Sequence, residues 1–302
     1  MSDVSRPGKV LYPASGSFAA HDKAAVIRYY REVAGYMLPH LADRFLTLHR
    51  FPDGIEADGF YQQSRQAHFP DCVRGVRAPR AGGEGSVEHI VVDGPDGLLY
   101  LADQGALAIH GWQSRCDRPR KPDRLVFDLD PADGGFGDVV DAARLLRELL
   151  ELAGLVPYVM TTGSRGLHVA APLERRLEFD DVRQLAATMA DALAAREPER
   201  FTREQRKQAR KGRLYLDIGR NAYGQTAIVP YSLRALPGAP VATPLAWQEL
   251  GRGDLTPRRF RLDNLFRRLG QKSDPWHDFF TRAARPRLDE EALRAWTEDR
   301  RG

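Results

Sequence analysis

The spacing of apolar residues along the chain predicts several amphipathic helices. In three segments apolar residues recur every three or four positions, so one face of each helix is expected to pack against a core: His21–Leu41, Phe136–Leu152 and Phe179–Ala195. A shorter helix is expected over Leu98–Ala108, which would bring Ile109 and His110 to the surface of the core.

Short apolar runs between these helices predict strands. Each run has strand length and is bounded by glycine, proline or polar residues: Leu125–Asp130, Val156–Thr161, Leu167–Ala171, Arg213–Ile218 and Thr226–Val229. This mixture of strands and helices predicts an α/β (α+β) fold. Periodicity alone does not give the order of the strands.

Composition limits the class of protein. The chain has 302 residues, 42% hydrophobic and 28% charged, which is typical of one large globular domain or two joined lobes. No run of about 18 apolar residues is present, so no membrane association is expected. Two cysteines and an N-terminus without a signal-peptide pattern favour a reducing cytoplasm.

Charge favours a polyanionic partner only weakly, because the formal net charge is +4. Its distribution along the chain is more informative. Six basic residues precede one of the expected strands: Arg203, Arg206, Lys207, Arg210, Lys211 and Arg213.

Two carboxylates lie in the run that ends Phe127-Asp128-Leu129-Asp130. Residues two apart on a strand point to the same face, so Asp128 and Asp130 are expected to project together. Adjacent carboxylates repel each other, and a divalent cation such as Mg²⁺ or Mn²⁺ relieves that repulsion. The alternative is a pair of solvated carboxylates, or caps of the following helix.

A second candidate feature is the loop Thr161–His168, with the sequence TTGSRGLH. Its backbone N–H groups, the Ser164 hydroxyl and Arg165 are suited to binding an anion, with Gly166 allowing close approach and His168 at the start of the next strand. The alternative is an ordinary hairpin turn followed by a core histidine. The spacing differs from that of a P-loop, which disfavours a Walker-type ATPase.

A third feature is Asp217, which lies alone in an apolar strand. Together with Asp128 and Asp130 it would provide three carboxylates on adjoining strands, enough to hold two metal ions for phosphoryl transfer. The alternative is that Asp217 caps a local loop.

Taken together, an ordered series of motifs resembles the polymerase domain of bacterial ATP-dependent DNA ligase D. That domain belongs to the archaeo-eukaryotic primase superfamily and acts in non-homologous end joining. The series covers nearly the whole chain: Lys9–Pro13 (KVLYP), Gly59–Gln62 (GFYQ), Ile109–Trp112 (IHGW), Asp123–Pro131 (DRLVFDLDP), Thr161–His168, Leu216–Asn221 (LDIGRN) and Pro230–Arg234 (PYSLR).

The resemblance implies a single primase-polymerase domain over residues 1–302, with mixed central sheets flanked by helices. Its DNA-end-binding portion would cover about 1–110, its catalytic core about 110–250 and a helical tail about 250–302. The implied activity is template-directed gap filling and 3′-end extension with NTPs or dNTPs, favouring ribonucleotides and using two Mn²⁺ or Mg²⁺ ions. The implied partners are DNA ends with a 5′-phosphate, a Ku-type end-binding protein and a DNA ligase, in the bacterial cytoplasm at the nucleoid.

The resemblance also implies roles for matching residues. Asp128, Asp130 and Asp217 would bind the metal ions. The nucleotide would be held by His110, Ser164, Arg165, Gly166, His168, Gln225 and Arg234. Lys9 and Lys23 would bind the DNA 5′-phosphate, and Arg50, Phe60 and Tyr61 the template strand. Without the resemblance, Phe60 and Tyr61 would be interpreted as core residues and Arg50 as a solvated strand end.

The chain departs from the family pattern at three places. The segment between Lys9 and Lys23 is longer than expected, Tyr61 replaces a second phenylalanine, and Arg165 replaces a lysine. The last two changes keep an aromatic face and a cation. Because no ligase or nuclease motif is evident, the chain is either a stand-alone polymerase or a part of a longer ligase.

Two other functions remain compatible with parts of the pattern. A non-catalytic module that binds 5′-phosphorylated ends would need only Lys9, Lys23 and the basic stretch, and has no use for three carboxylates. A metal-dependent nuclease would use the carboxylates, but has no use for a triphosphate-binding loop at Ser164–His168.

Overall fold

The computed structural model describes residues 4–131 and 135–299. The chain forms two compact units, each assembled from three segments. The first unit comprises Met1–Pro119, Thr226–Thr243 and Arg258–Asp274. The second comprises Arg120–Gln225, Pro244–Pro257 and Pro275–Gly302.

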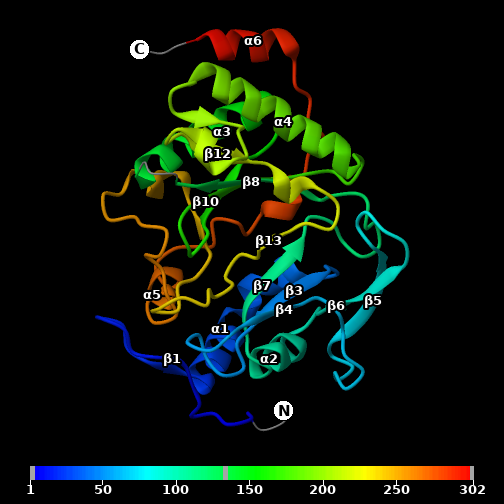
Figure 1. The fold of residues 1–302 in the computed structure, drawn as a ribbon, viewed down its shortest axis with the longest axis vertical. Coiled ribbons are helices and arrows are strands. Elements are labelled where there is room, and N and C mark those ends of the chain that lie inside the picture. The colour runs from blue at the N-terminus through cyan, green and yellow to red at the C-terminus, as the bar shows by residue number, and fades with distance from the viewer. Residues whose placement is uncertain (1–3, 132–134, 300–302) are drawn as a thin grey trace. The chain divides into compact units, whose positions relative to one another are not determined.

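The first unit contains an antiparallel sheet in the order β13-β7-β3-β6-β5, with β4 also paired to β3 (Figure 1). Its strands are β3 (Leu46–Arg50), β4 (Phe60–Gln62), β5 (Arg74–Pro79), β6 (Ser86–Val91), β7 (Ala106–Trp112) and β13 (Thr226–Ile228). A separate pair is formed by β1 (Val10–Tyr12) and β2 (His21–Asp22).

Helix α1 (Lys23–Leu41) confirms the first predicted helix. It begins at Asp22, whose side chain accepts a hydrogen bond from the backbone N–H of Ala25 and so caps an unpaired donor of the first turn. Its apolar face, which includes the fully buried Tyr30 and Val33, packs in the core of this unit together with α2 (Pro95–Asp103). The short helix α5 (Leu265–Leu269) lies in the same unit.

The helix predicted over Leu98–Ala108 is wrong in its second half. Helix α2 ends at Asp103, and β7 begins at Ala106, so that His110 lies within a strand. Gly105 separates the two elements with a positive φ of 78°. A side chain there would also meet Pro52, because an added Cβ would lie 2.9 Å from its Cα. This left-handed glycine reverses the chain and ends the helix.

The second unit contains a sheet in the order β11-β12-β8-β10-β9-β14. Strands β11 and β12 are parallel, whereas the β12–β8, β8–β10 and β10–β9 pairs are antiparallel. The strands are β8 (Arg124–Asp130), β9 (Tyr158–Thr161), β10 (Leu167–Pro172), β11 (Phe201–Thr202), β12 (Leu214–Asp217) and β14 (Thr243–Leu245).

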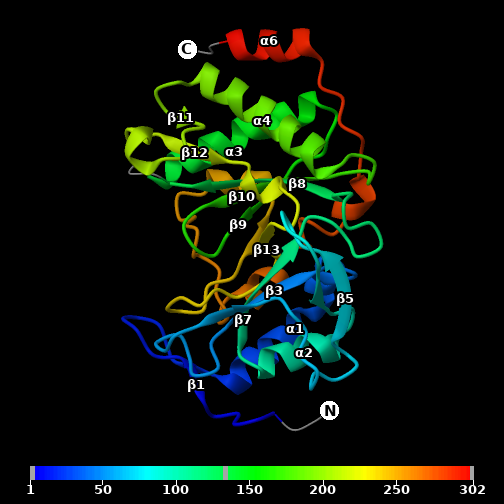
Figure 2. The same cartoon turned by 45° about the vertical axis from the view of Figure 1, so that its right-hand side comes forward.

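Three helices accompany this second sheet. Figures 1 and 2 show α3 (Phe136–Leu152) and α4 (Phe179–Arg196) on one face of it, with α6 (Glu290–Glu298) beyond them. The C-terminal stretch was expected to be a tail of short helices, and α5 and α6 do lie there. The unit also has short 3₁₀ turns: η1 (Lys207–Arg210), η2 (Gly219–Asn221), η3 (Trp247–Gly251) and η4 (Phe279–Arg282).

The fold class is therefore the mixed α/β arrangement of sheets flanked by helices that the sequence predicted. The interpretation as one polymerase domain in three portions stays a prediction. Within the described residues, no helix is both long enough and apolar enough to cross a membrane.

Candidate active site

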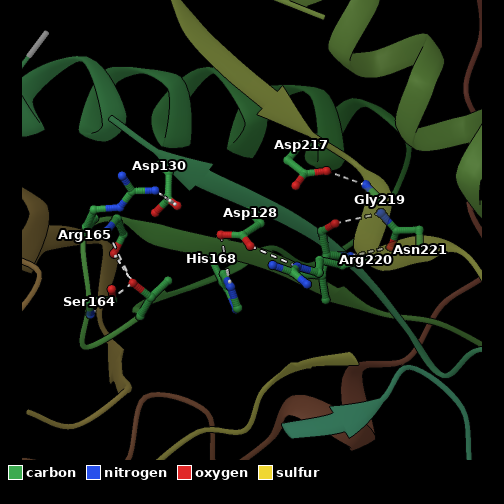
Figure 3. A network of polar contacts seen from close by, with 12 residues as sticks. Asp128, Asp130, Ser164, Arg165, His168, Asp217, Gly219, Arg220 and Asn221 are labelled. Atoms are coloured by element: carbon green, nitrogen blue, oxygen red, sulfur yellow. Dashed lines mark hydrogen bonds and ion pairs between the residues drawn. The ribbon is translucent and has the colours of Figure 1, made fainter. Parts of the chain in front are cut away.

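The central strand β8 and its neighbours β10 and β12 bring four candidate residues close together (Figure 3). Asp128 is in register with His168 on β10 and with Asp217 on β12. Two residues further along β8, Asp130 is in register with Tyr215. Since paired residues and residues two apart on a strand share a face, all five side chains belong to the same face of the sheet.

From Leu125 to Leu129 the residues of β8 other than Asp128 are apolar. Phe127 and Leu129 are fully buried, whereas the side chains of Asp128 and Asp130 keep 13% and 45% of their exposure. This alternation is the one that the sequence predicted, with both carboxylates on one face.

Asp128 is held by two nitrogen donors on different oxygens. Arg220 donates from Nε to Oδ2 over 3.0 Å, and Nε2 of the buried His168 lies 3.3 Å from Oδ1. Burial raises the pKa of the Asp128 carboxyl, but His168 and Arg220 lower it more strongly, so that the pKa lies well below its ordinary value. Asp128 is therefore an anion at neutral pH.

Asp130 is paired with the loop that was predicted to bind an anion. Arg165 donates a hydrogen bond to Oδ2 of Asp130 over 2.8 Å, and both side chains are substantially exposed. The hydroxyl of Thr162 accepts from the backbone N–H groups of Ser164 and Gly166, each at 3.3 Å. The loop is thus a tight turn closed on itself that carries a cation at its tip (Figure 3).

Asp217 accepts a hydrogen bond from the backbone N–H of Gly219 over 2.7 Å. This is the local cap that was the alternative interpretation, although its side chain also reaches the cavity described below. The turn that follows β12 is fixed to β8 by Asn221, whose side chain bonds the backbone N–H and carbonyl of Val126 at 2.8 and 2.7 Å. The distance between β12 and β8 is therefore fixed by side-chain as well as ladder bonds.

A cavity of about 400 Å³ lies over this face, entirely within the second unit. It is lined by the three carboxylates and by Pro131, Arg165, Lys207, Arg210, Gly212, Tyr215 and Arg220. The guanidinium of Arg210 lies 4.3 Å from the centre of the Tyr215 ring. Carboxylates and cations thus line the same cavity. This combination suits an anionic ligand with bound metal ions, because the carboxylates can bind the metal and the cations the anion.

The donor set fits a hard cation such as Mg²⁺ or Mn²⁺, because three carboxylates face one cavity. Among the described residues, however, no group of three or more His, Cys, Asp or Glu side chains converges on a single point. Two of the carboxylates are instead neutralised by Arg165 and Arg220. A metal ion here would compete with these arginines for carboxylate oxygens.

The remaining nucleotide-binding candidates belong to different units. His110, on β7, and Arg234 lie in the first unit, and Gln225 is an exposed residue of the second. Burial and, secondarily, the charge of Arg234 lower the pKa of His49. Arg234 therefore lies within electrostatic reach of the β3 strand.

Lys9 and Lys23 are brought together where β1 meets the start of α1. The backbone N–H of Lys23 donates to the carbonyl of Lys9 over 2.8 Å. Lys9 forms an ion pair with the exposed Asp53. Lys23 is 7% exposed, and its ammonium bonds Ser5 and both the carbonyl and the carboxylate of Asp103.

The template candidates lie on the β3–β4 pair of the first unit. Phe60 and Tyr61 are 46% and 67% exposed, so that they are not core residues. Arg50 lies over the Phe60 ring at 5.1 Å and donates to the backbone carbonyl of Gln104. With these contacts, Arg50 is not the freely solvated arginine of the alternative interpretation.

Four polar side chains that line the cavity were not among the sequence candidates for the site: Lys207, Arg210, Tyr215 and Arg220. A signal was available for each. Tyr215 lies two residues before Asp217 on the same strand, Arg220 lies in the LDIGRN motif, and the other two belong to the basic stretch before β12.

A family profile described as the LigD primase-polymerase domain matches residues 22–276 of this chain. The multifunctional non-homologous end joining DNA repair protein LigD of Mycobacterium tuberculosis (strain H37Rv) is 33% identical over 275 residues, which cover 88% of this chain and 35% of that protein. The bifunctional non-homologous end joining protein LigD of Bacillus subtilis is 34% identical over 260 residues, covering 85% and 41%. The chain thus spans between about a third and two fifths of these relatives' length.

A solved structure agrees with these sequence matches. The polymerase domain from Mycobacterium tuberculosis ligase D in complex with DNA superposes with a TM-score of 0.85 at 30% identity. The match covers 94% of this chain and 99% of that one.

Proposed function

The chain belongs to the LigD primase-polymerase domain family, and from this premise we propose that it is a template-directed nucleotidyltransferase. It fills gaps and extends 3′ ends at DNA double-strand breaks in non-homologous end joining, with a preference for ribonucleotides. One observation carries the proposal. Asp128 and Asp217 are paired on neighbouring strands, and together with Asp130 they line a cavity that four cationic side chains also line.

In this proposal Asp128, Asp130 and Asp217 hold two divalent ions of the Mg²⁺ or Mn²⁺ type. When bound, such ions activate the attacking hydroxyl and neutralise the leaving pyrophosphate. The carboxylates supply this site at neutral pH because Asp128 is already ionised. Their placement on the hydrogen-bonded strands β8 and β12 fixes the geometry before substrate arrives.

The cationic side chains then bind the triphosphate. Arg165 and Arg220 exchange Asp130 and Asp128 for phosphate oxygens, for which the guanidinium fork is suited. Ser164, Gly166 and His168 complete the phosphate-binding loop, and His110, Gln225 and Arg234 contact the rest of the nucleotide.

The first unit binds the DNA in this proposal. Lys9 and Lys23 take the 5′-phosphate at the far side of a gap, next to the N-terminus of α1, where the helix dipole favours an anion. Arg50, Phe60 and Tyr61 contact the template strand. A Ku-type protein and a DNA ligase are proposed partners, and residues 1–302 are proposed to act as one domain.

The composition of the cavity favours a polymerase over the two alternatives. A nuclease would place its carboxylates beside a phosphodiester and would not need four cations around them. A module that only binds ends would not need the carboxylates on β8 and β12. Templated addition of nucleotides to a primer is the experiment that tests the proposal.

Lys9→Ala is expected to reduce the preference for gapped DNA that carries a 5′-phosphate. Log affinity falls with log salt concentration, and one lost phosphate contact should make that slope less steep by about 0.9. Binding of unphosphorylated gaps should stay unchanged. Titrating labelled gapped duplexes with and without the phosphate, at several salt concentrations, measures both effects.

The ion pair between Lys9 and Asp53 allows a control variant with the opposite expected effect on binding. Asp53→Asn removes the competing carboxylate and should strengthen binding of the phosphorylated gap. If Lys9→Ala weakens both substrates equally, the 5′-phosphate assignment is wrong.

A further inference from the structure

His49 lies directly opposite Tyr61 in the antiparallel β3–β4 pair of the first unit. The two rings are parallel to within 10°, and their centres are 4.1 Å apart. Directly opposed residues in such a pair are the closest cross-strand neighbours, so the register of the two strands enforces this stack. His49 was not among the residues singled out from the sequence.

The ring contacts continue inward to the core. His49 also contacts Phe51, with ring centres 4.4 Å apart at an angle of 58°. Phe51 is 8% exposed, and its ring touches the backbone at Gly59, where an added Cβ would lie 2.4 Å from it. Three rings therefore lead from a fixed, buried phenylalanine through His49 to the exposed Tyr61.

Tyr61 stays largely open to solvent despite this stack. Tyr61 is 67% exposed although His49 covers one face of its ring. An exposed aromatic ring on a surface strand ordinarily samples several rotamers, and each rotamer lost on binding costs entropy. A ring that is already held flat by a neighbour avoids this cost.

We propose that His49 is a positioning residue, which holds Tyr61 as a preformed flat platform on which an unpaired nucleobase stacks. The proposal rests on the proposed function only in taking that base to be the template base within a gap. His49 acts through Tyr61 and does not itself contact the DNA.

The chemistry of His49 suits this task. Its partial burial, and secondarily the nearby Arg234, lower the pKa of the imidazole. The neutral ring can stack on the phenol without bringing a second positive charge next to Arg234. The neighbouring Arg50–Phe60 pair is built differently, because Arg50 is tied to the backbone of Gln104.

The test compares two substitutions of His49 that both place a large apolar side chain at this position. His49→Leu fills the space but has no aromatic face, whereas His49→Phe keeps the face. The ligand is a gapped duplex with 2-aminopurine as the unpaired template base. The control ligand is the same duplex with an abasic site at that position. Binding and quenching of 2-aminopurine fluorescence, which reports stacking, are measured for the whole chain.

His49→Leu should weaken binding of the 2-aminopurine duplex by about three- to tenfold, the range of one aromatic contact, and reduce quenching. Affinity for the abasic duplex should not change. His49→Phe should behave like the wild type, and so should His68→Ala, a control at an exposed histidine of the same unit. Tyr61→Ala should abolish the difference between the two duplexes.

The proposal is overturned if His49→Leu weakens both duplexes equally, weakens neither, or is matched by His49→Phe. These measurements do not need nucleotide addition. A wild type that prefers the base-containing gap but adds no nucleotide would therefore sink the proposed function and leave the role of His49 standing.

Discussion

Asp130→Asn is expected to abolish nucleotide addition while DNA binding survives. The substitution keeps the size of the side chain and an oxygen that can accept from Arg165, but it removes the negative charge that a divalent ion needs. Metal ions supply several kcal/mol of transition-state stabilisation. Since each 1.4 kcal/mol is a factor of ten, the rate should fall at least about 100-fold.

Single-turnover primer extension measures the rate, and titration of the gapped duplex measures binding. Asp180→Asn is a matched control, because Asp180 is exposed on the first turn of α4 and does not line the cavity. It should retain the wild-type rate. Near-normal extension by Asp130→Asn would contradict the assignment of the metal ligands.

Gly166→Ala should both destabilise the second unit and inactivate the site. A Cβ at this position would lie 1.7 Å from the backbone oxygen of Leu129 and 3.0 Å from Oδ1 of Asp130. The first contact is with backbone, so it is relieved only by separating β8 from β10, where Leu129 and Leu167 are in register. Overpacking of this kind costs about 1–3 kcal/mol, and we expect the upper part of that range.

Urea unfolding measures the loss of stability, and extension at low temperature, where the variant stays folded, measures the loss of activity. The control is Gly137→Ala in α3, where an added Cβ meets nothing within 4 Å. That change should raise stability slightly, because alanine favours a helix. An unchanged midpoint for Gly166→Ala would show that β8 and β10 do not pack as closely as described.

The local structure around the site could largely be predicted from the sequence. The alternation Phe127-Asp128-Leu129-Asp130 predicted a buried strand with both carboxylates on one face, and β8 has that arrangement. Helix α3 has the predicted bounds because its apolar periodicity is strong. The error at α2 and β7 arose because apolar residues continue past Gly105, and only the positive φ of that glycine ends the helix.

The contacts across strands could not be predicted. Periodicity does not give strand order, so the register that places Asp217 and His168 on either side of Asp128 was not available. For the same reason the ion pair of Arg220 with Asp128 and the stack of His49 on Tyr61 were missed. Each joins residues that lie far apart in the chain or on strands whose pairing is set by tertiary packing.

The burial of Lys23 shows a related limit. The sequence places a lysine at the start of a helix, but its three polar partners come from residues before and well after it in the chain. Its role in binding a 5′-phosphate stays a prediction, and so do the roles of the other site residues.

The central claim is tested most directly by primer extension on a short gapped duplex with a 5′-phosphate, in Mn²⁺ or Mg²⁺, with NTPs or dNTPs supplied separately. The account predicts addition directed by the template base, faster with NTPs, and lost when EDTA removes the metal. A chain that binds the duplex but adds no nucleotide with either metal would contradict it.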